Sequence, residues 1–360
     1  MSSASAAKGT PESKRLTEEI EKMFEQNILV EKKFLVISKG LDHGLCEIPI
    51  SLQEFRAEYE GRLGDLHSMP NYEEILDTWG FSWMTSIWQQ MLAESFPMMT
   101  SWSWKKQMQF LVCYSRWKRN IRQSARFHFV EIFAGQGNLS RELLRGGWEG
   151  LAMDLMYSAD HDVRSVRGFR MAINALCEMH NEGLVWFGTP CSSFVKLCKF
   201  STGRNITNNW MGKVDESPAA QQGNELMYVT LLLTMLASLN GNRWVIEQPC
   251  SSCLFDIPIV SRVMQLTQAY RVKTYGGAFG QPTLKPLQLW SNYVHINALS
   301  REFPDYAIGN DGCVDRDGDK FTGRPDDLQM SEVYTPEFGR AVESNMMRGI
   351  SRPSESEFGR

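Results

Sequence analysis

The stretch Phe127–Gly150, FHFVEIFAGQGNLSRELLRGGWEG, decides the fold of this chain. An apolar run leads into a turn of small residues with Gly135 and Gly137, and LSRELL follows with helical spacing. This order predicts a strand, a glycine loop and a helix, which form the first unit of an open α/β sheet. Glycine lets the backbone turn sharply and approach a ligand closely. The loop therefore indicates a site for a nucleotide or nucleoside cofactor, although a plain glycine turn also fits the stretch taken alone.

The composition is typical of a soluble globular protein. The chain has 360 residues, of which 42% are hydrophobic and 22% charged, and its net charge of −4 gives no overall basic character that would indicate nucleic acid. The polar N-terminus has no apolar run of a signal peptide, and the longest apolar run, near Tyr228–Leu239, is too short to span a bilayer. We therefore expect an intracellular protein of the nucleus or cytoplasm, without a membrane partner and with mostly reduced cysteines.

The predicted domain organisation has five parts. They are a disordered tail (1–14), a mostly helical, Trp-rich and basic accessory region (15–126), an α/β domain (127–300), an acidic loop with a closing C-terminal helix (301–350) and a second tail (351–360). In the accessory region, the segment 105–126 is basic and aromatic, so it can contact phosphates and stack on bases. A helical cap with buried aromatics and a solvated basic face fits the same segment, and both interpretations stay open.

Further strands follow the glycine unit. The range Glu149–Asp154 reads as a strand that ends in an acid, about 20 residues after the glycine loop, where an acid can bind ribose hydroxyls. The remaining predicted elements are a helix through RMAINALCEMH, a strand at Leu184–Gly188, a helix at Gln222–Leu239 and strands at Arg243–Ile246, Tyr270–Tyr275 and Leu287–Tyr293. The alternation predicts an α/β fold with a doubly wound, mostly parallel, Rossmann-like sheet and an N-terminal helical extension.

Two reactive side chains come directly after predicted strands. Cys191 follows one strand and Glu247 another, so both are expected at the sheet edge that carries the glycine loop. A thiol there can act as a nucleophile if Lys196 and the next helix dipole lower its pKa, and a carboxyl group in a buried pocket can donate or share a proton. A buried inert thiol and a helix-capping acid are the alternatives.

A metal site competes for the same cysteines. Cys250 and Cys253 form a C-x-x-C pair, and Cys191 and Cys198 are a second, more widely spaced pair. Four cysteines can bind zinc tetrahedrally. Because the second spacing is wider than usual, we expect no metal.

Five motifs together resemble the cytosine-C5 DNA methyltransferase family: FVEIFAGQGN, AMD, GTPCSSF, VIEQP and PTLKPLQLWSN. The resemblance implies a class I fold that uses S-adenosyl-L-methionine as its cofactor. It implies that Phe133 lies against the adenine, that Asp154 binds the ribose and that Asp162 reads the adenine amino group. The full set of cofactor-binding residues implied is Glu131, Phe133, Ala134, Gly135, Gly137, Asn138, Asp154, Asp162 and Pro190.

The resemblance also implies a chemistry. Cys191, in the Pro-Cys motif, would be the nucleophile that adds to C6 of cytosine, and Glu247 would be the partner of N3, so that C5 accepts the methyl group. The base would have to leave its duplex. The residues expected to contact the substrate are Ser192, Lys196 and Lys285.

The chain departs from the family pattern in its motifs and in its length. Asn138 stands where the family has Gly, Glu247 begins Glu-Gln-Pro instead of Glu-Asn-Val, and a target-recognition domain is reduced or missing. We expect an S-adenosylmethionine-dependent enzyme of DNA methylation type, with DNA or RNA as partner. The alternatives are a catalytically inactive domain that binds nucleic acid through segment 105–126, and a methyltransferase for a substrate other than nucleic acid.

Overall fold

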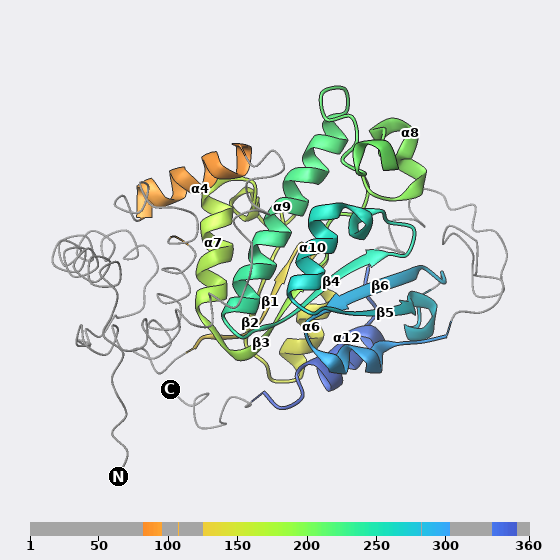
Figure 1. The fold of residues 1–360 in the computed structure, drawn as a ribbon. Helices are drawn as coiled ribbons and strands as arrows, with labels where there is room; N and C mark the ends of the chain where they lie inside the picture. The colour runs from red at the N-terminus through yellow and green to blue at the C-terminus, as the bar shows by residue number, and fades with distance from the viewer. Residues whose placement is uncertain (1–81, 96–106, 108–124, 282, 303–332, 351–360) are drawn as a thin grey trace, which may run out of the picture. The chain divides into compact units, whose positions relative to one another are not determined.

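The computed structural model describes residues 82–95, 107, 125–281, 283–302 and 333–350 (Figure 1). These residues all lie in one compact unit, which spans residues 69–360. Both predicted tails, most of the accessory region and most of the acidic loop lie outside the described residues. Of the basic segment 105–126, only residues 107, 125 and 126 are described.

A six-stranded sheet in the order β2-β1-β3-β4-β6-β5 forms the centre of the fold. Its strands are β1 (Phe127–Ile132), β2 (Gly150–Met153), β3 (Met179–Phe187), β4 (Arg243–Pro249), β5 (Tyr270–Tyr275) and β6 (Pro286–Ser291). The strands β1 to β4 pair in parallel, and β6 runs antiparallel to both β4 and β5. The predicted α/β class with a mostly parallel sheet is therefore confirmed. Every strand except β6 ends at the same edge, which we call the carboxyl edge.

Helices cover both faces of the sheet (Figure 1). The α-helices are α4 (Ser82–Ser95), α6 (Asn138–Arg145), α7 (Val166–Cys177), α8 (Lys199–Thr202), α9 (Pro218–Leu239), α10 (Pro258–Leu266) and α12 (Pro336–Met346). The 3-10 helices are η2 (Ala159–His161), η3 (Lys196–Cys198), η4 (Ile206–Asn208), η5 (Leu254–Asp256), η6 (Gly276–Phe279) and η7 (Val294–Leu299). Helices α6 and α12 pack together on one face, and α7, α9 and α10 lie on the other, with α4 against α7 and α9.

The side chains of alternate strand residues build the core. Trp186 of β3 and Val245 of β4 point to the α6 and α12 face, where they meet Leu139 of α6 and Phe338 of α12. Each fully buried apolar side chain contributes about 1.5–3 kcal/mol of hydrophobic free energy. Every residue of β1 is buried, as expected for a central parallel strand with helices on both faces. The core thereby fixes the strand ends at the carboxyl edge.

Three predicted boundaries are wrong. Helix α7 ends at Cys177, whereas the sequence indicated a helix through His180. Strand β3 begins already at Met179 because that residue pairs with Phe127 of β1. Strand β4 continues through Pro249, so that Glu247 lies within the strand and not after it. The antiparallel partner β6 extends the ladder over these residues, with Glu247 opposite Leu289.

None of the described helices is long and apolar enough to cross a membrane. The longest of them, α9, is mostly buried from Gly223 onward, against the sheet and its neighbouring helices.

Candidate functional site

The glycine loop connects β1 to α6 and adopts a left-handed backbone. Gly135 has φ 54° and Gly137 has φ 67°, which glycine reaches without steric cost. Phe133 also has a positive φ of 62°, which is costly for a residue with a β-carbon and is a feature of functional sites. A β-carbon built on Gly135 would have no described atom within 4 Å, so the space above this residue is open. The loop thus exposes its backbone to a ligand.

Asp154, at the end of β2, is hydrogen-bonded to the glycine loop. The Gly135 amide donates to Oδ2 at 2.8 Å, and the Met156 amide donates to Oδ1 at 2.8 Å. A carboxylate has about four acceptor positions, so each oxygen can still accept a hydroxyl. The structure therefore places Asp154 in contact with the loop.

Glu131 is a buried acid beneath the loop. Its side chain is 1% exposed, and Oε2 accepts hydrogen bonds from the Ser140 amide at 2.9 Å and the Ser140 hydroxyl at 2.5 Å. The second oxygen, Oε1, is buried without a hydrogen-bond partner among the described residues. Burial raises the pKa of Glu131 to about 7, against the lowering effect of Ser140. Near neutral pH this carboxyl can carry a proton and act as a donor.

Tyr157 lies against the glycine loop at Gly137. A β-carbon on Gly137 would stand only 2.6 Å from the Tyr157 hydroxyl. Burial raises the pKa of Tyr157, and the negative charges of Glu131 and Asp154 raise it further. Next to it, Leu155 and Met156 are 54% and 72% exposed. The end of β2 therefore offers an acid and an exposed apolar surface beside the glycine loop.

The Cys191 loop, residues 188–195, follows β3. The buried side chain of Arg204 hydrogen-bonds to this loop. Cys191 itself is half-buried, and its carbonyl accepts from the Phe194 amide at 2.8 Å. Arg204 is 2% exposed, donates from Nε to the Ser193 carbonyl at 2.7 Å and lies 4.1 Å from the Phe194 ring centroid. Its remaining hydrogen bonds go to Ser193 Oγ, the carbonyls of Trp210 and Ala220, and Asn224 Oδ1. Burial lowers the pKa of Arg204 to about 10. The guanidinium thus fixes the backbone two residues beyond the thiol.

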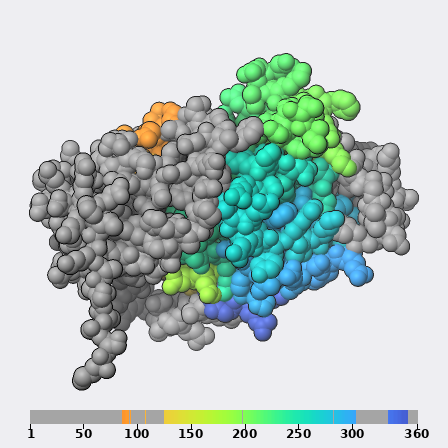
Figure 2. Space-filling model, in the orientation of Figure 1, coloured from red at the N-terminus to blue at the C-terminus, as the bar shows by residue number. Residues whose placement is uncertain are grey.

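The segment between β3 and α9, which carries α8, stands out from the surface (green in Figure 2). It bears two exposed apolar side chains, with Phe200 100% and Ile206 75% exposed. Lys199 Nζ lies 4.6 Å from the centroid of the Trp210 ring. A basic and apolar surface therefore borders the Cys191 loop.

The Cys191 loop is also joined to the end of β4. Gln248 Nε2 donates to the Thr189 carbonyl at 2.5 Å, and Gln248 Oε1 accepts from the Ser252 hydroxyl at 2.8 Å. Val195 and Ser252 form an antiparallel bridge. The thiol and the carboxyl group of Glu247 are therefore carried by two strand ends that are fixed to each other.

The two carboxyl oxygens of Glu247 differ in their hydrogen bonds. Its side chain is 8% exposed, and Oε2 accepts from the Tyr334 hydroxyl at 2.9 Å. Oε1 is buried and has no hydrogen-bond partner among the described residues. The Tyr334 hydroxyl in turn accepts from Trp186 Nε1 at 3.1 Å. Burial raises the pKa of Tyr334 well above its ordinary value, and the charge of Glu247 adds to this effect.

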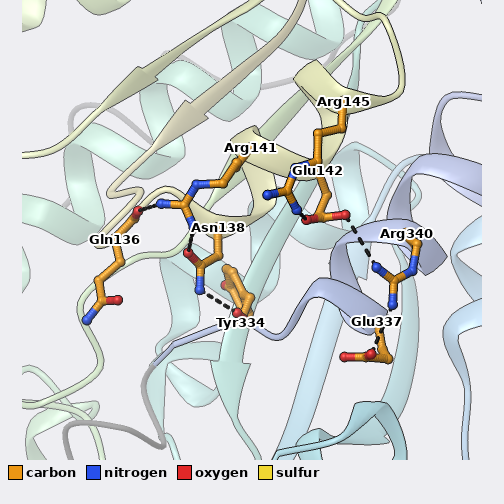
Figure 3. A network of polar contacts seen from close by, with 8 residues as sticks. All are labelled: Gln136, Asn138, Arg141, Glu142, Arg145, Tyr334, Glu337 and Arg340. Carbon is orange, nitrogen blue, oxygen red and sulfur yellow. Dashed lines mark hydrogen bonds and ion pairs between the residues drawn. The ribbon is translucent and has the colours of Figure 1, made fainter.

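A polar network links Tyr334 to the glycine loop (Figure 3). Asn138 Nδ2 donates to the Tyr334 carbonyl at 2.8 Å, and Asn138 Oδ1 accepts from Arg141 at 2.6 Å. Farther along the same helices, Arg340 approaches Glu142 at 3.6 Å and pairs with Glu337 at 2.9 Å. The start of α12 is thereby fixed to the start of α6.

The other predicted site residues are placed less uniformly. Both carboxylate oxygens of Asp162 accept hydrogen bonds from the Arg164 guanidinium, at 3.0 Å each. The carboxylate therefore pairs with Arg164 and does not point into the open space above the glycine loop. Burial works to raise the pKa of Asp162, but the hydrogen bonds and charge of Arg164 outweigh it and lower the pKa. Ala134 is buried in the loop, and Pro190, Ser192 and Lys196 are exposed beside Cys191. Lys285 is half-buried and immediately precedes β6, whose Pro286 carbonyl accepts from the Cys250 amide at 2.9 Å. This places Lys285 beside the end of β4.

The surroundings of the cysteines bear on two of the sequence hypotheses. Among the described residues, no group of three or more His, Cys, Asp or Glu side chains is arranged to hold a metal ion. Only the 3-10 helix η3 and the four-residue α8 follow Cys191, so no long helix directs its dipole at the thiol.

Sequence analysis missed four residues that shape the site: Tyr157, Arg204, Gln248 and Tyr334. Tyr157 follows Asp154 by three positions and Gln248 follows Glu247 directly, so proximity to a predicted residue was the available signal. Arg204 lies in a polar segment that carried no signal of burial. Tyr334 is distant in sequence from every other part of the site.

No protein-family model matches the chain, and the comparison with curated proteins finds no significant match. The carboxyl edge combines an open glycine loop, acids and a thiol on a loop held by hydrogen bonds with a buried carboxyl group, one oxygen of which has no hydrogen-bond partner among the described residues.

Proposed function

We propose that this protein is an S-adenosylmethionine-dependent methyltransferase of the cytosine-C5 type, with a Rossmann-like class I methyltransferase fold. One observation carries the proposal: the ends of β1, β2, β3 and β4 gather the glycine loop, Asp154, Cys191 and Glu247 at the same edge of a mostly parallel sheet. Ligands of open α/β sheets bind at that edge. The resemblance of the five motifs to the cytosine-C5 family supports the same conclusion.

The residues of the loop fit the cofactor. Gly135 leaves open space in front of an exposed backbone, which suits the close approach of the methionine part. The oxygens of Asp154 can accept ribose hydroxyls while they keep their main-chain hydrogen bonds. Phe133, Leu155 and Met156 supply apolar surface for a purine beside them. When bound, S-adenosylmethionine would supply an activated methyl group.

Cys191 and Glu247 would divide the remaining chemistry. The Cys191 thiolate adds to C6 of the cytosine ring, and the Glu247 carboxyl group holds N3, so that the electron pair of the C5–C6 bond becomes available at C5. Once C5 has been methylated it loses its proton to solvent water, and the electron pair left behind restores the double bond and expels the thiolate while N3 returns its proton to Glu247. The hydrogen bonds of Arg204 and Gln248 keep the two groups on fixed backbone, which favours such a two-point attack.

Calorimetric titration with S-adenosylhomocysteine tests cofactor binding directly. The proposal expects saturable heat from the folded wild-type protein. A second experiment measures transfer of labelled methyl groups to DNA and RNA by wild type, Cys191→Ser and the matched control Cys198→Ser. We expect loss of transfer only in Cys191→Ser. Transfer at full rate in that variant would exclude Cys191 as nucleophile, and absence of heat in a folded sample would exclude the cofactor.

Glu247→Gln separates base methylation from transfer to another class of acceptor. The substitution removes the proton partner of a ring nitrogen, so it should stop methylation of a base. A methyltransferase that acts on a different nucleophile would retain activity in this variant.

A further inference from the structure

The hydroxyl of Tyr334 lies between a group that can only donate and a group that can accept. Indole Nε1–H of Trp186 has no acceptor capacity, and it points at the hydroxyl oxygen from 3.1 Å. The single hydroxyl proton must therefore point the other way, toward Glu247 Oε2 at 2.9 Å. The direction of this hydrogen-bond chain is fixed, from Trp186 to Tyr334 to Glu247.

Glu247 Oε2 is consequently an acceptor. A proton on that oxygen would meet the proton of Tyr334, so any proton that Glu247 takes up must be on Oε1. That atom is the buried oxygen without a hydrogen-bond partner among the described residues. Leaving a buried carboxyl oxygen unpaired is costly unless a ligand completes it.

The ring of Tyr334 is held as firmly as its hydroxyl. It meets Trp186 edge-on, with ring centroids 5.9 Å apart, and stacks on Phe338 at 5.0 Å. Its main-chain carbonyl accepts from Asn138 of the glycine loop at 2.8 Å (Figure 3). Asn138 is the residue that stands where the cytosine-C5 family has Gly, and a glycine in its place would have no side chain to hold Tyr334.

We propose that Tyr334 is a positioning residue that fixes Oε1 of Glu247 as the atom presented to the substrate, and that Asn138 holds Tyr334 in place from the glycine loop. This role rests on the proposed function, in which Glu247 is the partner of a ring nitrogen. The inference adds that only one oxygen exchanges the proton, and that the loop and the carboxyl group are mechanically linked.

The direct test is the titration of Glu247 followed by carbon-13 NMR of glutamate carboxyls, with the Glu247 signal identified by its loss in Glu247→Gln. The titratable groups that face Glu247 are the hydroxyl of Tyr334 and the thiol of Cys250, and Glu131 acts on the same hydroxyl. Removing the Tyr334 hydroxyl takes away a donor to the ionised carboxylate. In Tyr334→Phe we therefore expect the titration midpoint of Glu247 to lie above that of the wild type.

Tyr293→Phe is the matched control because it removes a hydroxyl that donates to the Arg348 carbonyl at 3.3 Å, away from Glu247. It should leave the midpoint unchanged. Asn138→Ala is a second variant, outside the core, and should shift the midpoint in the same direction by a smaller amount. An unchanged midpoint in folded Tyr334→Phe, or in Asn138→Ala if the first variant does not fold, overturns the positioning role.

The titration needs neither cofactor nor activity, so it is independent of the proposed function. Titration of the wild type with S-adenosylhomocysteine reports on that function alone. A shifted midpoint without cofactor binding would keep the Tyr334–Glu247 pair and reject the methyltransferase. Cofactor binding with an unshifted midpoint would keep the methyltransferase and reject the positioning role of Tyr334.

Discussion

The main-chain amide of Gly135 donates a 2.8 Å hydrogen bond to the carboxylate of Asp154. This bond joins the turn after β1 to the end of the neighbouring strand β2. The charge of the carboxylate stabilises the left-handed backbone of the loop, and the loop in turn orients the carboxylate. One side chain thus both shapes the loop and faces the ligand that the loop would bind.

Asp154→Ala should weaken binding of S-adenosylhomocysteine strongly. The variant loses the anchor of the loop and the acceptor for the ribose hydroxyls. A hydrogen bond to a charged group contributes about 1.5–3 kcal/mol, so we expect roughly a 10- to 100-fold rise in Kd by calorimetry. Asp215→Ala, at an exposed position before α9, is the control and should bind as wild type does. Equal affinities of the two variants would remove Asp154 from the binding site.

The two loop glycines should respond differently to a methyl group. Both have positive φ, so Gly135→Ala and Gly137→Ala should each lose about 1–2 kcal/mol of unfolding free energy. A methyl group on Gly135 enters open space in front of the loop, whereas one on Gly137 would stand 2.6 Å from the Tyr157 hydroxyl, so the Tyr157 side chain would have to move. We therefore expect Gly135→Ala to lose more free energy of ligand binding than free energy of unfolding.

Calorimetry with S-adenosylhomocysteine and urea unfolding of the same two samples decide this point. The comparison is internally controlled because the backbone strain is similar in both variants. If Gly135→Ala binds the ligand as tightly as wild type does, the open space above that residue is not where the ligand lies.

The hydrophobic pattern of the sequence predicted the ends of the strands well. It did not predict the residues that complete the site. The sequence patterns placed β1, β2 and β5 close to their observed bounds. For β1 the reason is burial, because a strand between two helical layers needs apolar side chains on both faces. Glu247 was placed after its strand because the antiparallel pairing with β6 leaves no local signal.

Long-range contacts explain the residues that were missed. Tyr334 reaches the site across 196 positions from Asn138, and no period in the sequence encodes such a contact. Arg204 lies in a segment rich in Ser, Thr, Asn and Gly, which reads as an exposed loop. Its burial depends on five acceptors that only the folded backbone brings together.

Glu131 should make the stability of the protein fall as the pH rises through the weakly acidic range. Burial raises the pKa of Glu131 from 4.5 to about 7 in the folded protein, whereas the unfolded chain releases the proton near the ordinary value. Between these values the folded state binds more protons than the unfolded state, so the free energy of unfolding decreases with increasing pH. The loss would amount to about 3 kcal/mol and would be complete about one pH unit above the folded-state pKa of about 7.

Glu131→Gln removes this titration, so the difference in unfolding free energy between wild type and variant isolates it. The difference should decline from about pH 4.5 through pH 7 and level off about one pH unit above 7. Urea unfolding at closely spaced pH values measures it. Glu337→Gln, at a position 54% exposed on α12, should show no such decline. A constant difference for Glu131→Gln would mean that the buried carboxyl is ionised throughout.

Arg204 should be essential for the shape of the Cys191 loop. Arg204→Met leaves several buried acceptors, including the Ser193 carbonyl, without a donor. Each buried unsatisfied group costs about 1–3 kcal/mol, so we expect a loss of at least about 3 kcal/mol in urea unfolding. Arg204→Lys should also be destabilised, because an ammonium cannot replace the planar fork. Arg167→Met is the control: its exposed pair with Asp160, at 2.9 Å, is worth less than about 1 kcal/mol. Wild-type stability of Arg204→Lys would show that charge, and not the guanidinium geometry, holds the loop.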